Sequence, residues 1–208
     1  MSRHAPGFAH WVTHVNGVKP PQALRDWLTD NTSLTMKLLA HSTHFRVQKL
    51  KQQRGRCLVD ECEMVGLSRR ACVQEREVLL VCDGNPVVYA HTIVPLYATA
   101  ADWPFFGGLG ERSLGSTLFG DPRVRQGRLH YARLQAQHPL ARRALVAIGG
   151  KAISFPLFAR RCLYRRRKGQ LLVTELFLPS VLELTKPPQV SCSGVLDLEK
   201  QKIDELIL

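Results

Sequence analysis

The sequence predicts an α+β protein in which one antiparallel sheet of about six strands carries short helical flaps. Three observations support this fold class: short apolar segments recur along the chain, tight-turn signals join two pairs of them, and the helical patterns between them are few and short. The chain has 208 residues, of which 45% are hydrophobic and 22% charged, so it can bury a core as a single domain.

We expect the folded domain to span residues 20–182. A lead-in over residues 1–19 precedes it, and a C-terminal extension over residues 183–208 follows it. The apolar pattern weakens after Pro179, and the extension holds prolines, small residues and a mixed-charge end, with a short helix expected from about residue 196.

Two short helices are expected at the start of this domain. Leu24, Trp27 and Leu28 form one apolar stripe of the first helix, and Ser33 is a suitable N-cap for the second, which runs to Leu39. A helix, a turn and a helix in succession could read DNA or could form a flap over a sheet. Neither helix carries a basic face, so we favour the flap.

Strand patterns dominate the next part of the chain. Residues 45–51 alternate between apolar and polar, and residues 57–66 are expected to form another strand. The segments 76–82 and 86–95 flank Asp83-Gly84-Asn85, which is a strong turn signal, so they predict a β-hairpin.

The remaining elements follow in order. We expect a short helix over residues 113–119, a strand over 127–134 and a helix over 139–149 that stops at a Gly-Gly pair. A second hairpin is predicted from strands over 158–167 and 171–178, with its turn at Lys168-Gly169-Gln170.

Two charged residues stand on apolar strand faces. Glu175 shares its face with Leu171 and Val173, and Arg76 shares its face with Val78, since strand side chains alternate between faces. A charged group on such a face is rare unless it pairs with an opposite charge or serves a ligand. The two residues could pair with each other in the core, or they could line a small buried site for a charged ligand.

The formal net charge of +12 favours anionic partners such as nucleic acid, acidic lipid or an anionic metabolite. The basic residues are mostly arginines in short clusters, without the interleaved aromatic side chains that bind single strands and without a nucleic-acid motif. We therefore expect no nucleic-acid partner. A solvated basic surface is the plainer interpretation of the charge.

No apolar run is long enough to span a membrane, and the N-terminal residues lack the apolar core of a signal peptide. We therefore expect a cytoplasmic protein without stable membrane insertion. The six cysteines include no C-x-x-C pair, and reduced thiols are expected in that compartment. His41 and His44 have helical spacing but no evident third ligand, so we expect no metal site.

Several motifs together resemble the chorismate–pyruvate lyase family. They are the hairpin from Arg76 to Pro95, the pair Leu114-Gly115 followed by Leu118-Phe119, and the ending Thr174-Glu175-Leu176-Phe177-Leu178-Pro179 at a fixed distance after Arg160-Arg161. The ending is the most specific of these motifs. The similarity covers roughly residues 20 to 182.

The resemblance implies an enzyme that converts chorismate to 4-hydroxybenzoate and pyruvate, the first committed step towards ubiquinone in many bacteria. It implies a carbon–oxygen lyase without metal or cofactor, a sheet whose helical flaps close over an internal site, and a monomer whose partners are the substrate and its products. The alternative is an effector-sensing domain of a transcription regulator, which has a similar fold and binds small acids without turnover. No winged-helix segment precedes the domain in this sequence, which favours the enzyme.

The resemblance also assigns functional residues position by position. Arg76 and Glu175 would be the catalytic residues: Arg76 would bind a substrate carboxylate, and Glu175 would donate a proton or orient the ring 4-hydroxyl. Leu114 would bind the ligand through its backbone N–H, and Leu34 falls near a flap position that is often Met in the family. His91 replaces an arginine common in the family, which could weaken the support of Glu175 unless a cation from the 160–168 cluster compensates.

Overall fold

The structure is a computed structural model that describes residues 9–68 and 71–184. Part of the predicted lead-in and nearly all of the predicted C-terminal extension, including the short helix expected from about residue 196, lie outside the described residues. The three-part division of the chain therefore stays a prediction.

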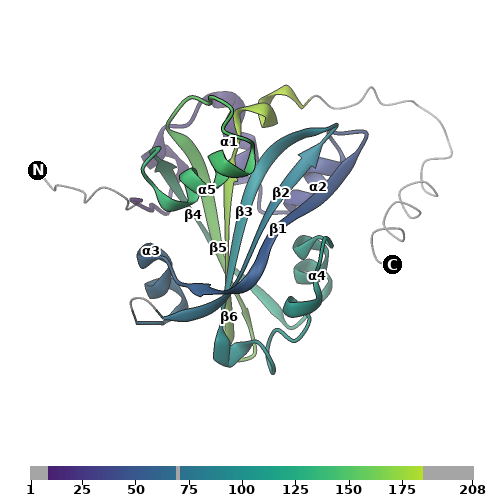
Figure 1. Ribbon diagram of the computed structural model, residues 1–208, viewed down its shortest axis with the longest axis vertical. Coiled ribbons are helices and arrows are strands. Elements are labelled where there is room, and N and C mark those ends of the chain that lie inside the picture. Colours follow the sequence, from purple (N-terminus) through teal and green to yellow (C-terminus); the bar gives the residue numbers. More distant parts are fainter. Residues whose placement is uncertain (1–8, 69–70, 185–208) are drawn as a thin grey trace, which may run out of the picture.

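An antiparallel sheet of six strands forms the centre of the molecule, in the order β1-β2-β3-β6-β5-β4 (Figure 1). Its strands are β1 (Phe45–Arg56), β2 (Cys72–Cys82), β3 (Asn85–Pro95), β4 (Val124–Leu134), β5 (Leu157–Arg166) and β6 (Gly169–Phe177). All neighbouring strands pair antiparallel. The predicted α+β class is confirmed, and β1 and β4 are the edge strands.

Two tight hairpins fix the register of the central strands. Asp83 and Gly84 join β2 to β3 and have φ values of 48° and 82°, so both adopt the left-handed region that a two-residue type I′ turn requires. Glycine reaches this region without strain, which explains the Asp-Gly signal. Arg167 and Lys168 join β5 to β6, so the second turn lies slightly earlier in the chain than the predicted Lys168-Gly169-Gln170.

Five α-helices accompany the sheet in the described residues: α1 (Gln22–Thr29), α2 (Leu34–Leu39), α3 (Val59–Cys62), α4 (Leu114–Gly120) and α5 (Pro139–Ala147). Short 3-10 turns lie at Val15–Val18, Glu63–Val65, Leu96–Ala98, Phe106–Gly108 and Pro179–Glu183. The four predicted helices inside the domain are therefore confirmed, with ends that differ by a few residues. None of the helices in the described ranges has the length and apolar character needed to cross a bilayer.

The prediction of a strand over residues 57–66 was wrong, because this segment forms α3 and a 3-10 turn. The Leu58 carbonyl accepts hydrogen bonds from the N–H groups of Glu61 and Cys62, each at 3.0 Å. Cys62 and Val65 are both buried in one apolar cluster against the sheet. A separation of three residues between inward side chains is typical of a helical turn and not of a strand.

The helices divide between the two faces of the sheet (Figure 1). α1, α2 and α4 pack on the face that carries Val78 and Val173, which we call the front face. α5 and α3 pack on the opposite face, which carries Leu79 and Tyr89 and which we call the back face. The two helices at the start of the domain thus lie on the sheet as a flap does, and α2 helps to enclose the space described next.

Candidate active site

A hollow lies on the front face, between the sheet and the helices α2 and α4. Four of the five predicted site residues line it: Leu34, Arg76, Leu114 and Glu175. They come from four different elements, α2, β2, α4 and β6. The free space between the side chains is about 60 Å³, which is room for only a few water molecules. A larger ligand can therefore enter only when a flap moves.

Arg76 is the buried cation of the hollow, and only 2% of its surface is exposed. Its Nη2 donates hydrogen bonds to the carbonyl oxygens of Gly110 (3.0 Å) and Arg112 (2.9 Å). Its Nε is buried and has no hydrogen-bond partner among the described residues. Burial lowers the pKa of Arg76 to about 10, so the group stays charged at neutral pH. An anion in the hollow would supply the missing partner.

Arg76 and Glu175 do not pair with each other, which removes the alternative of a simple core ion pair. The strand register explains why. Arg76 on β2 lies opposite Thr92 on β3, and Thr92 lies opposite Val173, two residues before Glu175 on β6. The two charged groups therefore line one hollow from strands that β3 separates.

Glu175 pairs instead with Arg160, which lies directly opposite on β5. Arg160 Nε donates to Glu175 Oε2 at 2.5 Å, and Arg160 Nη1 donates to the carbonyl oxygens of Trp27 (3.1 Å) and Asp30 (2.6 Å). These carbonyls lie at the C-terminal end of α1, where helix carbonyls lack helical partners. Burial opposes the charge of Arg160, but Glu175, with smaller contributions from Tyr164 and Asp30, outweighs burial and raises the pKa of Arg160. A cation of the 160–168 cluster thus supports the acid and ties it to α1.

A hydrogen bond joins α2 to the residue that precedes α4, the two helices that cover the hollow. Ser33 caps α2 as predicted, since its Oγ accepts a hydrogen bond from the N–H of Met36 at 3.5 Å. Leu114 is the first residue of α4, so its N–H belongs to the first-turn donors that have no acceptor within the helix. The hydroxyl groups of Thr35 in α2 and Ser113 before α4 share a hydrogen bond of 2.6 Å, which we call the latch.

Sequence reasoning gave no role to Arg160, Thr35 or Ser113 in particular. Strand side chains alternate between the two faces of the sheet, and this alternation identified Arg76 as a charged residue on an apolar face. The same alternation identifies Arg160, which shares its face of β5 with the buried residues Cys162 and Tyr164. No comparable signal marks the latch, since its two hydroxyl groups are 78 positions apart in the chain.

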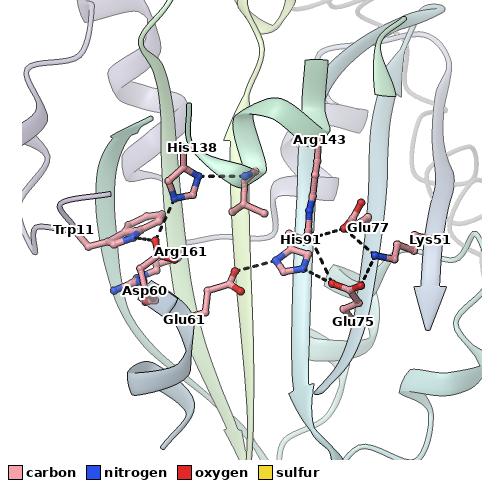
Figure 2. Close-up of polar contacts among 11 residues, drawn as sticks. Trp11, Lys51, Asp60, Glu61, Glu75, Glu77, His91, His138, Arg143 and Arg161 are labelled. Carbon is pink, nitrogen blue, oxygen red and sulfur yellow. Dashed lines mark hydrogen bonds and ion pairs between the residues drawn. The ribbon is translucent and has the colours of Figure 1, made fainter. Parts of the chain in front are cut away.

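The fifth predicted residue, His91, does not line the hollow. It lies on the back face, where its Nδ1 is 2.9 Å from Glu61 and its Nε2 is 3.4 Å from Glu75 (Figure 2). Lys51 and Arg143 bind the same group of carboxylates. The sheet separates this position from the hollow, so His91 does not contact the acid that it was expected to affect.

Part of this network has the donor types of a metal site. Glu75, Glu77 and His91 offer atoms within 4.8 Å of one another, all from buried residues. Two cations already neutralise the carboxylates: Arg143 lies 2.7 Å from Glu77, and Lys51 pairs with Glu75. The arrangement fits a buried ion-pair network, and we assign no metal to it.

His91 should make the stability of the fold depend on alkaline pH. Burial alone would lower its pKa, but Glu61 and Glu75 raise it from 6.5 to about 9. The stabilisation by the imidazolium is therefore complete below pH 6.5 and is lost as the pH rises towards 9. We expect the free energy of unfolding in urea to fall by about 3 kcal/mol over this range. His91→Gln should remove this dependence, and the same slope in both proteins would contradict the assignment.

The sequence profile described as Chorismate lyase matches residues 6–185. The chain belongs to the chorismate lyase family. A protein named probable chorismate pyruvate-lyase from Ralstonia nicotianae is 45% identical over 181 residues, which cover 84% of this chain and 93% of that protein. A protein of the same name from Cupriavidus pinatubonensis is 45% identical over 180 residues, which cover 85% of this chain and 91% of that protein.

Beyond these chorismate lyase relatives, the fold recurs at low sequence identity. A crystal structure of the C-terminal domain of PhnF matches with a TM-score of 0.50 and 16% identity, over 68% of this chain and 87% of that one. A likeness at this level of identity concerns the fold alone. It agrees with an antiparallel sheet covered by short helices.

Proposed function

We propose that this protein is a chorismate–pyruvate lyase, which converts chorismate to 4-hydroxybenzoate and pyruvate on the route to ubiquinone. The observation that carries the proposal is the guanidinium of Arg76, which lines a closed hollow and has no carboxylate partner among the described residues. A buried unpaired charge is costly, and a dianionic ligand such as chorismate would offset that cost. Membership of the family and the names of the relatives support the same reaction.

We assign each lining residue a role in holding the substrate. Arg76 would hold a carboxylate through Nε and a terminal nitrogen, and the N–H of Leu114 would bind a further anionic oxygen. Glu175, held by Arg160, would accept a hydrogen bond from the ring 4-hydroxyl. Because Glu175 already accepts a hydrogen bond from Arg160, we favour orientation over proton donation as its role.

The proposed reaction needs no covalent intermediate between the protein and the substrate. The C–O bond between the ring and the enolpyruvyl group breaks, and its electron pair leaves with the enolpyruvate oxygen. The ring carbon that bears the 4-hydroxyl loses its hydrogen as a proton, so the ring becomes aromatic. A proton gained at the methylene carbon of the enolpyruvate then gives pyruvate. Because aromatisation supplies the driving force, the hollow has to position the substrate and stabilise the charge that moves onto the departing enolpyruvate. Arg76 would supply a fixed positive charge for this purpose, while Arg160 holds Glu175 in position.

The latch should limit how fast the aromatic product leaves the closed hollow. Thr35→Val keeps the shape of the side chain but removes the hydroxyl group, so α2 and α4 lose their hydrogen bond. We expect release of 4-hydroxybenzoate to become about fivefold faster, for a hydrogen bond worth about 1 kcal/mol. Stopped-flow dilution of the product complex measures this rate.

A matched control is available for the latch. Ser116→Ala also removes a hydroxyl group from α4, but that group bonds to the carbonyl oxygen of Ser113 and does not reach α2. Its release rate should equal that of the wild type. Equal rates in Thr35→Val and Ser116→Ala would show that the latch does not hold the product.

Turnover of chorismate tests the proposed function. Purified protein is incubated with chorismate in the presence of EDTA, and 4-hydroxybenzoate and pyruvate are followed separately. We expect the two products to form in equal amounts. Binding of chorismate without turnover would support the effector-sensing alternative, and neither binding nor turnover would overturn the proposal.

A further inference from the structure

A wide cleft opens on the back face, along the edge strand β4 and its neighbour β5. Its volume is about 910 Å³, which lies within the range of small-molecule sites. We call it the basic cleft, because its lining holds the arginines Arg125, Arg128, Arg161 and Arg165 against only two carboxylates, Asp60 and Glu63.

Three arginines of the basic cleft have no charged partner within the part of the chain that the structure describes. Arg125, Arg128 and Arg165 are exposed, and their side chains form no ion pair or hydrogen bond with described residues. Arg125 and Arg165 lie directly opposite each other on the antiparallel pair of β4 and β5. Like charges directly opposite each other destabilise a sheet, and an anion bound between the two arginines would offset this repulsion.

Arg161 adds a buried charge to the cleft, with only 6% of its surface exposed. Its guanidinium lies 4.2 Å from the centre of the Trp11 ring, and its Nη1 donates to the carbonyl oxygen of Asp60 at 2.7 Å (Figure 2). The carboxylate of Asp60 is bound by Trp11 Nε1 and lies 3.4 Å from His138; it attracts Arg161 but forms no direct ion pair with it. The Nε of Arg161 is buried without a hydrogen-bond partner among the described residues.

The basic cleft adjoins the hollow. Gln126 of β4 lines both cavities. The exposed residues of the hollow lining are Thr32, Phe119 and Gln126, of which Gln126 lies on the edge strand β4. β4 is an edge strand with irregular pairing between Gln126 and Leu129, so no further strand lies beyond it at the edge where the two cavities adjoin.

We infer that the basic cleft is a second anion-binding site, which captures the dianionic substrate before it enters the hollow; this inference rests on the proposed lyase function. Arginine binds carboxylates through its planar fork of N–H donors. A cleft lined by charges of one sign raises the local concentration of an oppositely charged ligand and its association rate by tenfold or more, as a rough magnitude. The capture is weak and sensitive to salt, because most of these arginines face solvent.

Neutralising two exposed arginines of the cleft tests this inference. The double variant Arg125→Gln with Arg165→Gln should lower kcat/KM for chorismate about fivefold at low ionic strength and leave kcat unchanged, because the chemistry takes place in the hollow. Sodium chloride at about 0.5 M should remove the difference from the wild type, since it screens exposed charges.

The matched control is Arg46→Gln with Arg54→Gln, which removes the same charge from exposed arginines of the other edge strand, β1. Its kcat/KM should stay within about twofold of the wild-type value. An equal fall in both double variants would overturn the inference, because net charge alone would then explain the effect. An unchanged kcat/KM in the cleft variant would overturn it as well.

Direct binding separates failure of this inference from failure of the proposed function. If the wild type does not turn chorismate over, the lyase proposal fails. Binding of chorismate to the basic cleft can still be measured without turnover. In Arg76→Gln, where the hollow has lost its cation, chorismate should still quench the fluorescence of Trp11. Adding Arg125→Gln and Arg165→Gln should abolish this quenching, and quenching that persists would overturn the assignment of the cleft.

Discussion

Arg76→Gln should lower kcat/KM for chorismate on the order of 100-fold, the expected cost of losing hydrogen bonds from a charged donor to a charged ligand. Glutamine keeps a polar amide near the position of Arg76 Nε, but it is too short to replace the Nη2 contacts to Gly110 and Arg112 and brings neither the charge nor the two-pronged geometry of a guanidinium. The kcat/KM of Arg76→Lys should lie between those of the wild type and Arg76→Gln, because lysine keeps the positive charge but lacks the paired N–H donors of the guanidinium. Steady-state lyase assays at several chorismate concentrations measure these losses.

Two measurements separate this effect from a loss of folding. Thermal unfolding shows whether Arg76→Gln remains folded at the assay temperature, and equilibrium dialysis with 4-hydroxybenzoate should show weaker binding of the product. Arg46→Gln, an exposed arginine on β1, should behave as the wild type in both assays. A folded Arg76→Gln variant with wild-type kcat/KM would remove Arg76 from the site.

Glu175→Gln should lower kcat on the order of 100-fold, with a smaller change in KM. The amide has nearly the same shape as the carboxylate, but it lacks the charge that pairs with Arg160 and that would orient the ring hydroxyl. The loss should therefore appear in the chemical step more than in binding. Single-turnover kinetics isolates that step from product release.

Arg160 should act on the reaction through Glu175. Arg160→Gln should lower kcat by a similar factor, and the double variant with Glu175→Gln should lose little more than either single variant, because the two residues work as a pair. Arg160→Gln should also cost about 3 kcal/mol of unfolding free energy, since it breaks a buried pair and releases the end of α1. Multiplicative losses of kcat in the double variant would show that Arg160 acts independently of the acid.

The faces of the strands could be predicted from the sequence because alternation is a local property. It placed Arg76 and Glu175 among inward apolar residues, and both line the hollow. The partner of Glu175 could not be predicted, because pairing across a hairpin depends on the position of the turn. A turn centred on Gly169 would set Glu175 opposite Leu163, whereas the observed turn sets it opposite Arg160.

Contacts between distant segments explain the other differences. The segment 57–66 has a mixed apolar and polar pattern that fits either a strand or a helical turn. Packing of Cys62 and Val65 against the sheet favours the helical turn. The helical turn places Glu61 within hydrogen-bond distance of His91. The environment of His91 therefore depends on a segment that was predicted as a strand. The basic cleft likewise forms only when β4, β5, α3 and the segment around Trp11 meet.

A crystal structure of the protein with 4-hydroxybenzoate tests the central claim most directly. We predict the product in the hollow, with its carboxylate within hydrogen-bond distance of Arg76 Nε and the Leu114 N–H and its hydroxyl group against Glu175. The product bound elsewhere, with the hollow unoccupied and Arg76 Nε still without a partner, would contradict the account.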